Sequence, residues 1–104
     1  MRKLHASDMA DTQDILIIDA NPLDRAEIRR LLLTDSTHQR RIIEADCGHE
    51  GIRLAFGRRG RPLDCILLSC NLPDMDTIAV LEALCGNDLT PIRPVVAVTD
   101  SCPV

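Results

Sequence analysis

The chain has 104 residues, a formal net charge of −4 at pH 7 and 45% hydrophobic residues, with Phe56 as its single aromatic side chain. This length fits one domain with a modest aliphatic core. The negative charge gives no electrostatic reason to expect nucleic acid or an anionic membrane surface as a partner. No apolar run approaches the ~18 residues of a membrane span, and no apolar signal segment follows Met1, so we expect a cytoplasmic protein without a membrane segment.

The five cysteines are odd in number and lack paired spacing, which does not indicate a disulfide framework. We interpret them as reduced thiols that serve as small apolar side chains. A zinc site is not expected, because His5, His38 and His49 show no ligand spacing with the cysteines.

The N-terminal region divides at residue 13. Residues 1–13 are polar and without periodicity, and we expect a flexible leader there, followed by a domain over residues 14–104. The domain opens with residues 14–19, a short apolar run rich in β-branched residues that predicts a buried strand.

A well-marked helix start follows this strand. Asn21 is a suitable N-cap and Pro22 suits the first helical position. The helix should end near residues 34–37, a cluster of loop-forming residues. Its inward stripe is predicted to be Ile28, Leu31 and Leu32, and its water-facing side chains are predicted to be Arg25, Glu27, Arg29 and Arg30.

A second strand and a second helix come next. Residues 41–45 form a short apolar segment that predicts the strand, and the second helix is expected to open within residues 45–52. Gly51 lies inside this helix and should weaken it by ~1 kcal/mol relative to alanine.

The stretch from residue 64 to residue 76, D-C-I-L-L-S-C-N-L-P-D-M-D, is the most informative part of the chain. Its short apolar run, bounded by turn residues, predicts a strand buried on both faces. Pro73 ends the strand pattern, and Asp76 precedes a third helix with an apolar stripe at Ile78, Leu81 and Leu84. Residues 94–99 predict a fourth buried strand. This alternation of strands and helices predicts an α/β fold with a parallel sheet and helices on both faces.

Two stretches resemble response-regulator receiver domains. Residues 66–80 resemble the third strand and following turn, which in those domains usually read L-L-D-x-x-L-P-D-M-D-G, and residues 45–52 resemble the pattern A-x-x-G-x-E-A-L that opens the second helix. The resemblance covers residues 14–100 and implies a flavodoxin-like sheet with strand order 2-1-3-4. It also implies a domain truncated after the fourth strand, in which the fifth strand and the last two helices are missing.

The resemblance implies a site at the carboxyl ends of the strands, where receivers hold Mg²⁺ and a phosphoryl group. Asp19 matches the first acidic position, but Ala20 occupies the second. Ser69 stands at the phospho-acceptor position, so the acyl phosphate cannot form. Asn71 matches the position whose backbone carbonyl faces the metal, and Thr99 matches the phosphoryl-binding hydroxyl. No residue can supply the phosphate-binding lysine, because the chain ends first.

The function implied is that of a degenerate, or pseudo-, receiver domain of a two-component phosphorelay protein. It would not be phosphorylated and would not be an enzyme, but would act as a protein-interaction or regulatory module. We expect no cofactor, apart from weak Mg²⁺ binding at most. Expected partners are proteins: a histidine kinase, an output domain or a second copy of the chain.

Two alternatives stay open. The first is an active receiver-like phospho-acceptor or metal-binding protein that uses a substitute acidic residue such as Asp74. The second, more remote, is a small α/β enzyme. A nucleophilic Ser69 would need a base, and His49, at the start of the second helix, is the nearest histidine in the predicted topology but lies in no segment predicted to reach it.

The missing end of the fold leads to one more expectation. Without a fifth strand, the edge of the fourth strand at residues 95–98 would lack a partner, and the sheet face beside the first helix would be partly bare. We therefore expect a homodimer that forms through the fourth-strand edge or through the bare sheet face.

Overall fold

The computed structural model describes residues 12–34, 39–57, 63–70, 72–85 and 95–98. The predicted leader at residues 1–13 therefore lies almost entirely outside the described residues. The elements follow the predicted order and begin and end within a few residues of the predicted positions. They are β1 (Gln13–Ile18), α2 (Pro22–Thr34), β2 (Arg40–Ala45), α3 (Gly48–Phe56), β3 (Cys65–Ser69), α4 (Thr77–Cys85) and β4 (Val95–Val98).

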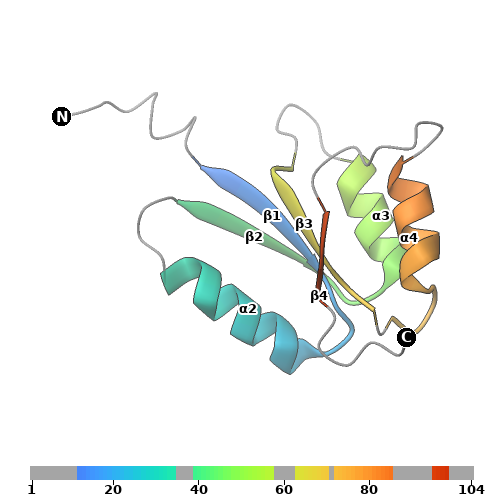
Figure 1. Cartoon of the computed structure of the whole chain (residues 1–104). Helices are drawn as coiled ribbons and strands as arrows, with labels where there is room; N and C mark the ends of the chain where they lie inside the picture. Colours follow the sequence, from blue (N-terminus) through green and yellow to red (C-terminus); the bar gives the residue numbers. More distant parts are fainter. Residues whose placement is uncertain (1–11, 35–38, 58–62, 71, 86–94, 99–104) are drawn as a thin grey trace.

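The four described strands form one parallel sheet in the order β2-β1-β3-β4. This confirms the predicted flavodoxin-like order. Figure 1 shows α2 on one side of the sheet and α3 and α4 side by side on the other. Each crossover carries a helix, and the strand ends that follow β1 and β3 lie at the same edge.

The main core lies between the sheet and the pair α3 and α4. Side chains alternate along each strand, so one set of positions faces these helices. This core is buried and consists of strand residues Leu16, Ile18, Ala45, Ile66 and Leu68, of Leu63 before β3, and of Val80 and Leu84 on α4. Ile15 and Ile17 of β1 are also buried but belong to the other face of the sheet, on the side of α2.

Helix α2 covers its face of the sheet only in part, since none of its residues is buried. Its inward side is formed by Arg25, Ile28 and Leu32, each of which is half-buried. The prediction that Leu31 faces the core is wrong, because its side chain is 56% exposed. Leu31 lies roughly 100° around the helix from Leu32, on the flank of the inward side.

Helix α4 is rotated relative to the predicted stripe. Val80 and Leu84, one turn apart, are fully buried, whereas Ile78 is 62% exposed. Two helical steps place Ile78 on nearly the opposite side from Val80. The prediction of Ile78 as a core residue is therefore wrong, while Leu84 is confirmed and Leu81 packs against the core in part.

Two glycines let α3 approach its neighbours closely. A Cβ on Gly51 would lie 2.4 Å from Ile18 Cδ1 and 2.7 Å from Ile18 Cγ1, and a Cβ on Gly48 would lie 2.8 Å from Met75 Sδ. Real Cβ atoms do not come so near to other heavy atoms. The glycine that costs helix propensity therefore allows close packing of α3 on β1.

The cysteines do not all behave as predicted. Cys47, Cys65 and Cys85 are free thiols, and burial raises the pKa of Cys65. Cys70 is disulfide-bonded, so the interpretation as a reduced thiol is wrong for this residue. Sequence spacing does not report which thiols a fold brings together.

Candidate functional site

The carboxyl end of β1 carries the first predicted site residue. Asp19 is buried, and its backbone N–H donates a hydrogen bond to the carbonyl of Ala45 at 3.0 Å. Its Oδ1 accepts a hydrogen bond from the backbone N–H of Asn21 at 2.9 Å. The carboxylate therefore shapes the turn between β1 and α2. Ala20, at the second predicted acidic position, is half-buried and offers no side-chain ligand.

Ser69 lies at the same edge of the sheet. It is the last residue of β3, and the pairing of Ile18 with Leu68 brings the next residues, Asp19 and Ser69, to one edge. Ser69 is buried, and its carbonyl accepts a hydrogen bond from Thr77 Oγ1 at 3.5 Å. Thus the structure brings together three residues of the predicted site, Asp19, Ala20 and Ser69. Asn71 and Thr99 lie outside the described residues.

The donor atoms at this edge can be tested against a metal. Mg²⁺ prefers octahedral oxygen ligands and is usually held by one or two carboxylates with several waters. The described edge offers the carboxylate of Asp19, one oxygen of which already accepts a backbone hydrogen bond, and the hydroxyl of Ser69. No group of three or more metal-ligating side chains occurs among the residues that the structure describes. This donor set does not fit a Mg²⁺ centre of the receiver kind.

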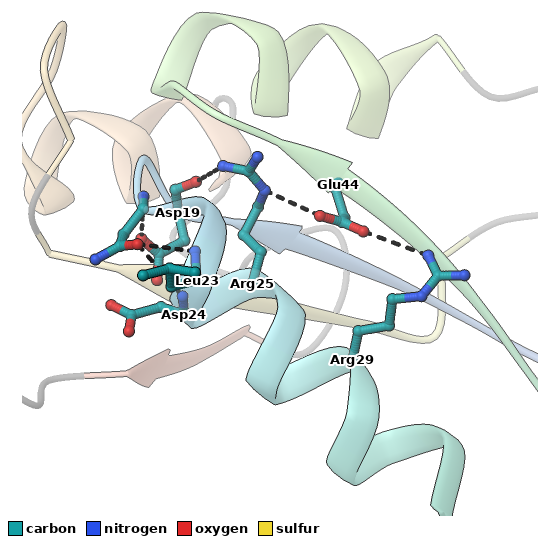
Figure 2. A network of polar contacts seen from close by, with 7 residues as sticks. Asp19, Leu23, Asp24, Arg25, Arg29 and Glu44 are labelled. Carbon is teal, nitrogen blue, oxygen red and sulfur yellow. Dashed lines mark hydrogen bonds and ion pairs between the residues drawn. The ribbon is translucent and has the colours of Figure 1, made fainter.

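The loop after β1 is held by a polar network that the sequence did not predict (Figure 2). Arg25 donates through Nη1 to the carbonyl of Asp19 at 2.6 Å and through Nε to Glu44 Oε1 at 2.9 Å. Arg29 donates to the other carboxylate oxygen of Glu44 at 3.3 Å. The side chain of Arg25 is only 18% exposed, so the prediction that it faces water is wrong.

A sequence signal for this network does exist. Arg25 precedes Ile28 by three residues and Leu32 by seven, which is the spacing of the inward side of a helix. An arginine in such a stripe needs a carboxylate or carbonyl partner. The predicted start of α2 is confirmed, because Asn21 Oδ1 accepts hydrogen bonds from Leu23 N at 2.8 Å and Asp24 N at 3.4 Å.

Asp74, the predicted substitute acceptor, has a structural role. Its Oδ1 accepts a hydrogen bond from Gly48 N at 2.8 Å and its Oδ2 accepts one from His49 N at 2.9 Å, so it caps α3 from the loop between β3 and α4. The His49 ring also bonds to Oδ2. These hydrogen bonds, above all the one from the His49 backbone, lower the pKa of Asp74 well below its ordinary value of 3.8.

The other acidic residue of this loop is a cap as well. Asp76 Oδ1 accepts a hydrogen bond from Ala79 N at 2.8 Å at the start of α4. Asp74 and Asp76 are therefore both used by helix N-termini, where a carboxylate is favourable.

An open polar hollow of about 410 Å³ lies beside the Arg25 network. It is lined by Arg25, Glu44, Ala45, Asp46, Cys47 and Glu50. Glu44 is paired with Arg25, and Glu50 with Arg53. With two of its carboxylates already neutralised by arginines, the hollow offers no strong ligand set.

Comparison with known proteins identifies the fold. No protein-family model matches the chain, and a search of curated proteins found no match. Among solved structures, the bacteriophytochrome response regulator AtBRR superposes with a TM-score of 0.68 and 26% identity, over 88% of this chain and 69% of that one. The phosphorylated cyanobacterial phytochrome response regulator RcpA gives a TM-score of 0.75 and 24% identity, over 88% and 68%.

A third structure is more distant. The receiver domain of Ssk1 from Saccharomyces cerevisiae, in complex with the histidine phosphotransfer protein Ypd1, gives a TM-score of 0.55 and 18% identity, over 86% of this chain and 63% of that one. The chain therefore has the fold of response-regulator receiver domains, and the predicted resemblance is confirmed.

No helix among the described residues is both long enough and apolar enough to cross a membrane.

Proposed function

We propose that this chain is a receiver domain of two-component signalling that does not accept a phosphoryl group and acts through contacts with other proteins. The receiver fold of its structural neighbours supports the signalling class. The observation that carries the proposal is Ser69 at the carboxyl end of β3, next to Asp19. A serine hydroxyl has no carboxylate with which to form an acyl phosphate.

The rest of the edge supports the same conclusion. Phosphoryl transfer relies on bound metal and fixed positive charge to neutralise the charge that develops on the phosphoryl oxygens. With Ala20 at the second acidic position, Asp19 is the one carboxylate of the three matching positions. The Asp19 carboxylate is also engaged by the backbone of Asn21.

The geometry of Asp74 disfavours the alternative of a substitute acceptor. Both of its oxygens accept backbone hydrogen bonds from α3. Attack on a phosphodonor would withdraw a carboxylate oxygen from these bonds and uncap the helix. The lowered pKa of Asp74 has the same origin, because these hydrogen bonds stabilise the charged carboxylate.

The partners follow from the class. One structural neighbour is a receiver domain in complex with a histidine phosphotransfer protein. By analogy, we propose that this chain binds proteins: a histidine kinase or phosphotransfer protein, an output domain, or a second copy of itself. The cytoplasmic location and the homodimer expected from the sequence belong to this proposal.

The proposal is tested with a small phosphodonor. We expect that acetyl phosphate or phosphoramidate, added with Mg²⁺, leaves the intact mass of the chain unchanged. A mass increase that hydroxylamine removes would show an aspartyl phosphate and overturn the proposal. If such an increase appeared, Asp74→Asn would report whether Asp74 carried it.

The matched comparison restores the receiver carboxylates. We expect the unaltered chain to bind Mg²⁺ weakly, with a Kd of roughly tens of millimolar or more, because of its small ligand count. The variant Ala20→Asp with Ser69→Asp should bind Mg²⁺ more tightly, as measured by calorimetry. Equal binding by the two proteins would mean that the metal-binding edge has been assigned to the wrong residues.

A further inference from the structure

Helix α2 exposes an unusual amount of apolar surface. Among the described residues, five large hydrophobic side chains are exposed, and three of them lie on this helix. They are Leu23 (78%), Leu31 (56%) and Leu33 (46%). Single exposed leucines are ordinary on a protein surface. Three on one helix of 13 residues, none of which is buried, indicate a surface that another molecule covers.

The inward side of α2 and its flank toward β2 are already in use. Arg25, Ile28 and Leu32 face the sheet, and Arg25 and Arg29 both bond to Glu44 on β2 (Figure 2). The outward side is what remains for a partner. At 3.6 residues per turn, this side carries Leu23 near the start, Leu33 near the end, and Glu27 and Arg30 between them.

The charges on this outward side are of opposite sign. The side chains of Glu27 and Arg30 are 57% and 62% exposed and form an ion pair within the helix. A partner of one uniform charge would meet like charge at one of the two positions. A partner that presents an arginine to Glu27 and a glutamate to Arg30 would match both positions.

We propose that the partner is a second copy of the chain, with the two α2 helices packed antiparallel across a two-fold axis. Leu23 and Leu33 each lie five residues from Ile28, the midpoint of Pro22–Thr34. A two-fold axis near this midpoint sets Leu23 of one copy against Leu33 of the other, and Glu27 of one copy beside Arg30 of the other. The face is thus complementary to itself, as an isologous interface requires.

The size of the face sets the strength of this dimer. A 13-residue helix is roughly 20 Å long. Two such helices in contact bury less than the ~1,200 Å² found in stable specific complexes. The dimer is therefore weak and dependent on concentration.

The inference rests on the proposed function in one respect: it identifies the protein partner as a second copy.

Charge reversal tests the arrangement. Sedimentation of the 104-residue chain from micromolar to millimolar concentration should show the mean mass rising from monomer toward dimer. Glu27→Arg alone and Arg30→Glu alone should each weaken dimerisation by about tenfold or more, because each places like charges together across the axis. An equimolar mixture of the two variants should dimerise again, since each then meets the opposite charge in the other.

The matched control is Ile78→Glu, which alters an exposed apolar side chain on α4 and should leave dimerisation unchanged. Glu27, Arg30, Leu23 and Ile78 are more than half exposed and Leu33 is 46% exposed, and circular dichroism checks that the variants keep the fold. A chain that stays monomeric throughout would overturn the inference. So would dimerisation that survives Leu23→Glu combined with Leu33→Glu, which would place the interface elsewhere, for example at the β4 edge.

These outcomes are distinct from those that concern the proposed function. A monomeric chain that also fails to accept phosphate would overturn the dimer alone. A chain that dimerises through α2 and yet forms an aspartyl phosphate would overturn the proposed function alone.

Discussion

Gly51 shows what a single missing Cβ contributes to this fold. Alanine at this position would gain ~1 kcal/mol in helix propensity. Its Cβ would, however, lie 2.4 Å from the Cδ1 of the fully buried Ile18, and overpacking of this kind costs ~1–3 kcal/mol. We expect Gly51→Ala to lower the free energy of unfolding by about 1 kcal/mol, measured by urea denaturation.

The control for this prediction is a double-mutant cycle. Ile18→Val removes the methyl group nearest to the new Cβ. Gly51→Ala should therefore lower the free energy of unfolding by less in the Ile18→Val background than in the original chain. An equal cost in both backgrounds would contradict the packing explanation.

Asp74 joins the loop after β3 to α3. Asp74→Asn keeps the shape of the side chain but removes its charge, and we expect a lower thermal midpoint at neutral pH, because two backbone N–H groups of α3 lose a carboxylate acceptor. Asp46→Asn is the control: Asp46 is an exposed carboxylate two residues before α3, and no hydrogen bond to its side chain is found among the described residues. A similar loss in both variants would show that charge near the helix, and not the hydrogen bonds, is responsible.

The lowered pKa of Asp74 also predicts a dependence on pH. The carboxyl has a lower pKa in the folded chain than its ordinary value of 3.8, so its contribution to stability is fully present above that value. It is lost as the pH falls below 3.8 and through the folded-state pKa. We expect the difference in stability between the original chain and Asp74→Asn to be constant near neutral pH and to shrink in acid. A difference that grows on acidification would contradict this assignment.

At the scale of elements, polar contacts help to hold α2 on the sheet. Arg25 joins the carbonyl of Asp19 to the carboxylate of Glu44 through two nitrogens of one planar group. A lysine ammonium cannot reproduce this geometry. We expect Arg25→Lys to lower the free energy of unfolding by roughly 1–2 kcal/mol in urea denaturation.

The neighbouring arginine offers a matched comparison. Arg29 is half-exposed and makes one longer contact to the same carboxylate, at 3.3 Å. Arg29→Lys should change stability by less than about 0.5 kcal/mol. If the two substitutions lower the free energy of unfolding equally, the hydrogen bond from Arg25 to the Asp19 carbonyl contributes no additional stability.

At the scale of the whole molecule, the described helices cover the two faces of the sheet unequally. Among them, α3 and α4 lie on one face and α2 on the other (Figure 1). The consecutive leucines of β3 report this difference: Leu68 is fully buried under α3 and α4, whereas Leu67 points to the other face and is half-buried. We expect Leu68→Ala to lower the free energy of unfolding by about 3 kcal/mol and Leu67→Ala to lower it by about 1 kcal/mol.

Urea denaturation of the two variants measures this asymmetry under one set of conditions. Equal losses would mean that the face beside α2 is as well packed as the other.

Much of the fold could be predicted from the sequence, because its signals are local. Short apolar runs separated by turn residues mark the strands, and Asn21 with Pro22 marks the start of α2. The motif around Ser69 indicates the receiver fold and the strand order, and the absence of an aspartate at this position is visible in the sequence itself. These features depend on neighbours a few residues away, which is what a sequence pattern records.

The tertiary structure decided how the elements face one another. The apolar residues of α2 and α4 allow several rotations, and only packing on the sheet places Leu31 and Ile78 outside and Arg25 inside. Asp74 caps a helix that begins 26 residues earlier, and Gly51 is needed because Ile18 of another element lies against it. Contacts between residues so far apart along the chain leave no periodic trace, because each depends on where two separate elements meet in space.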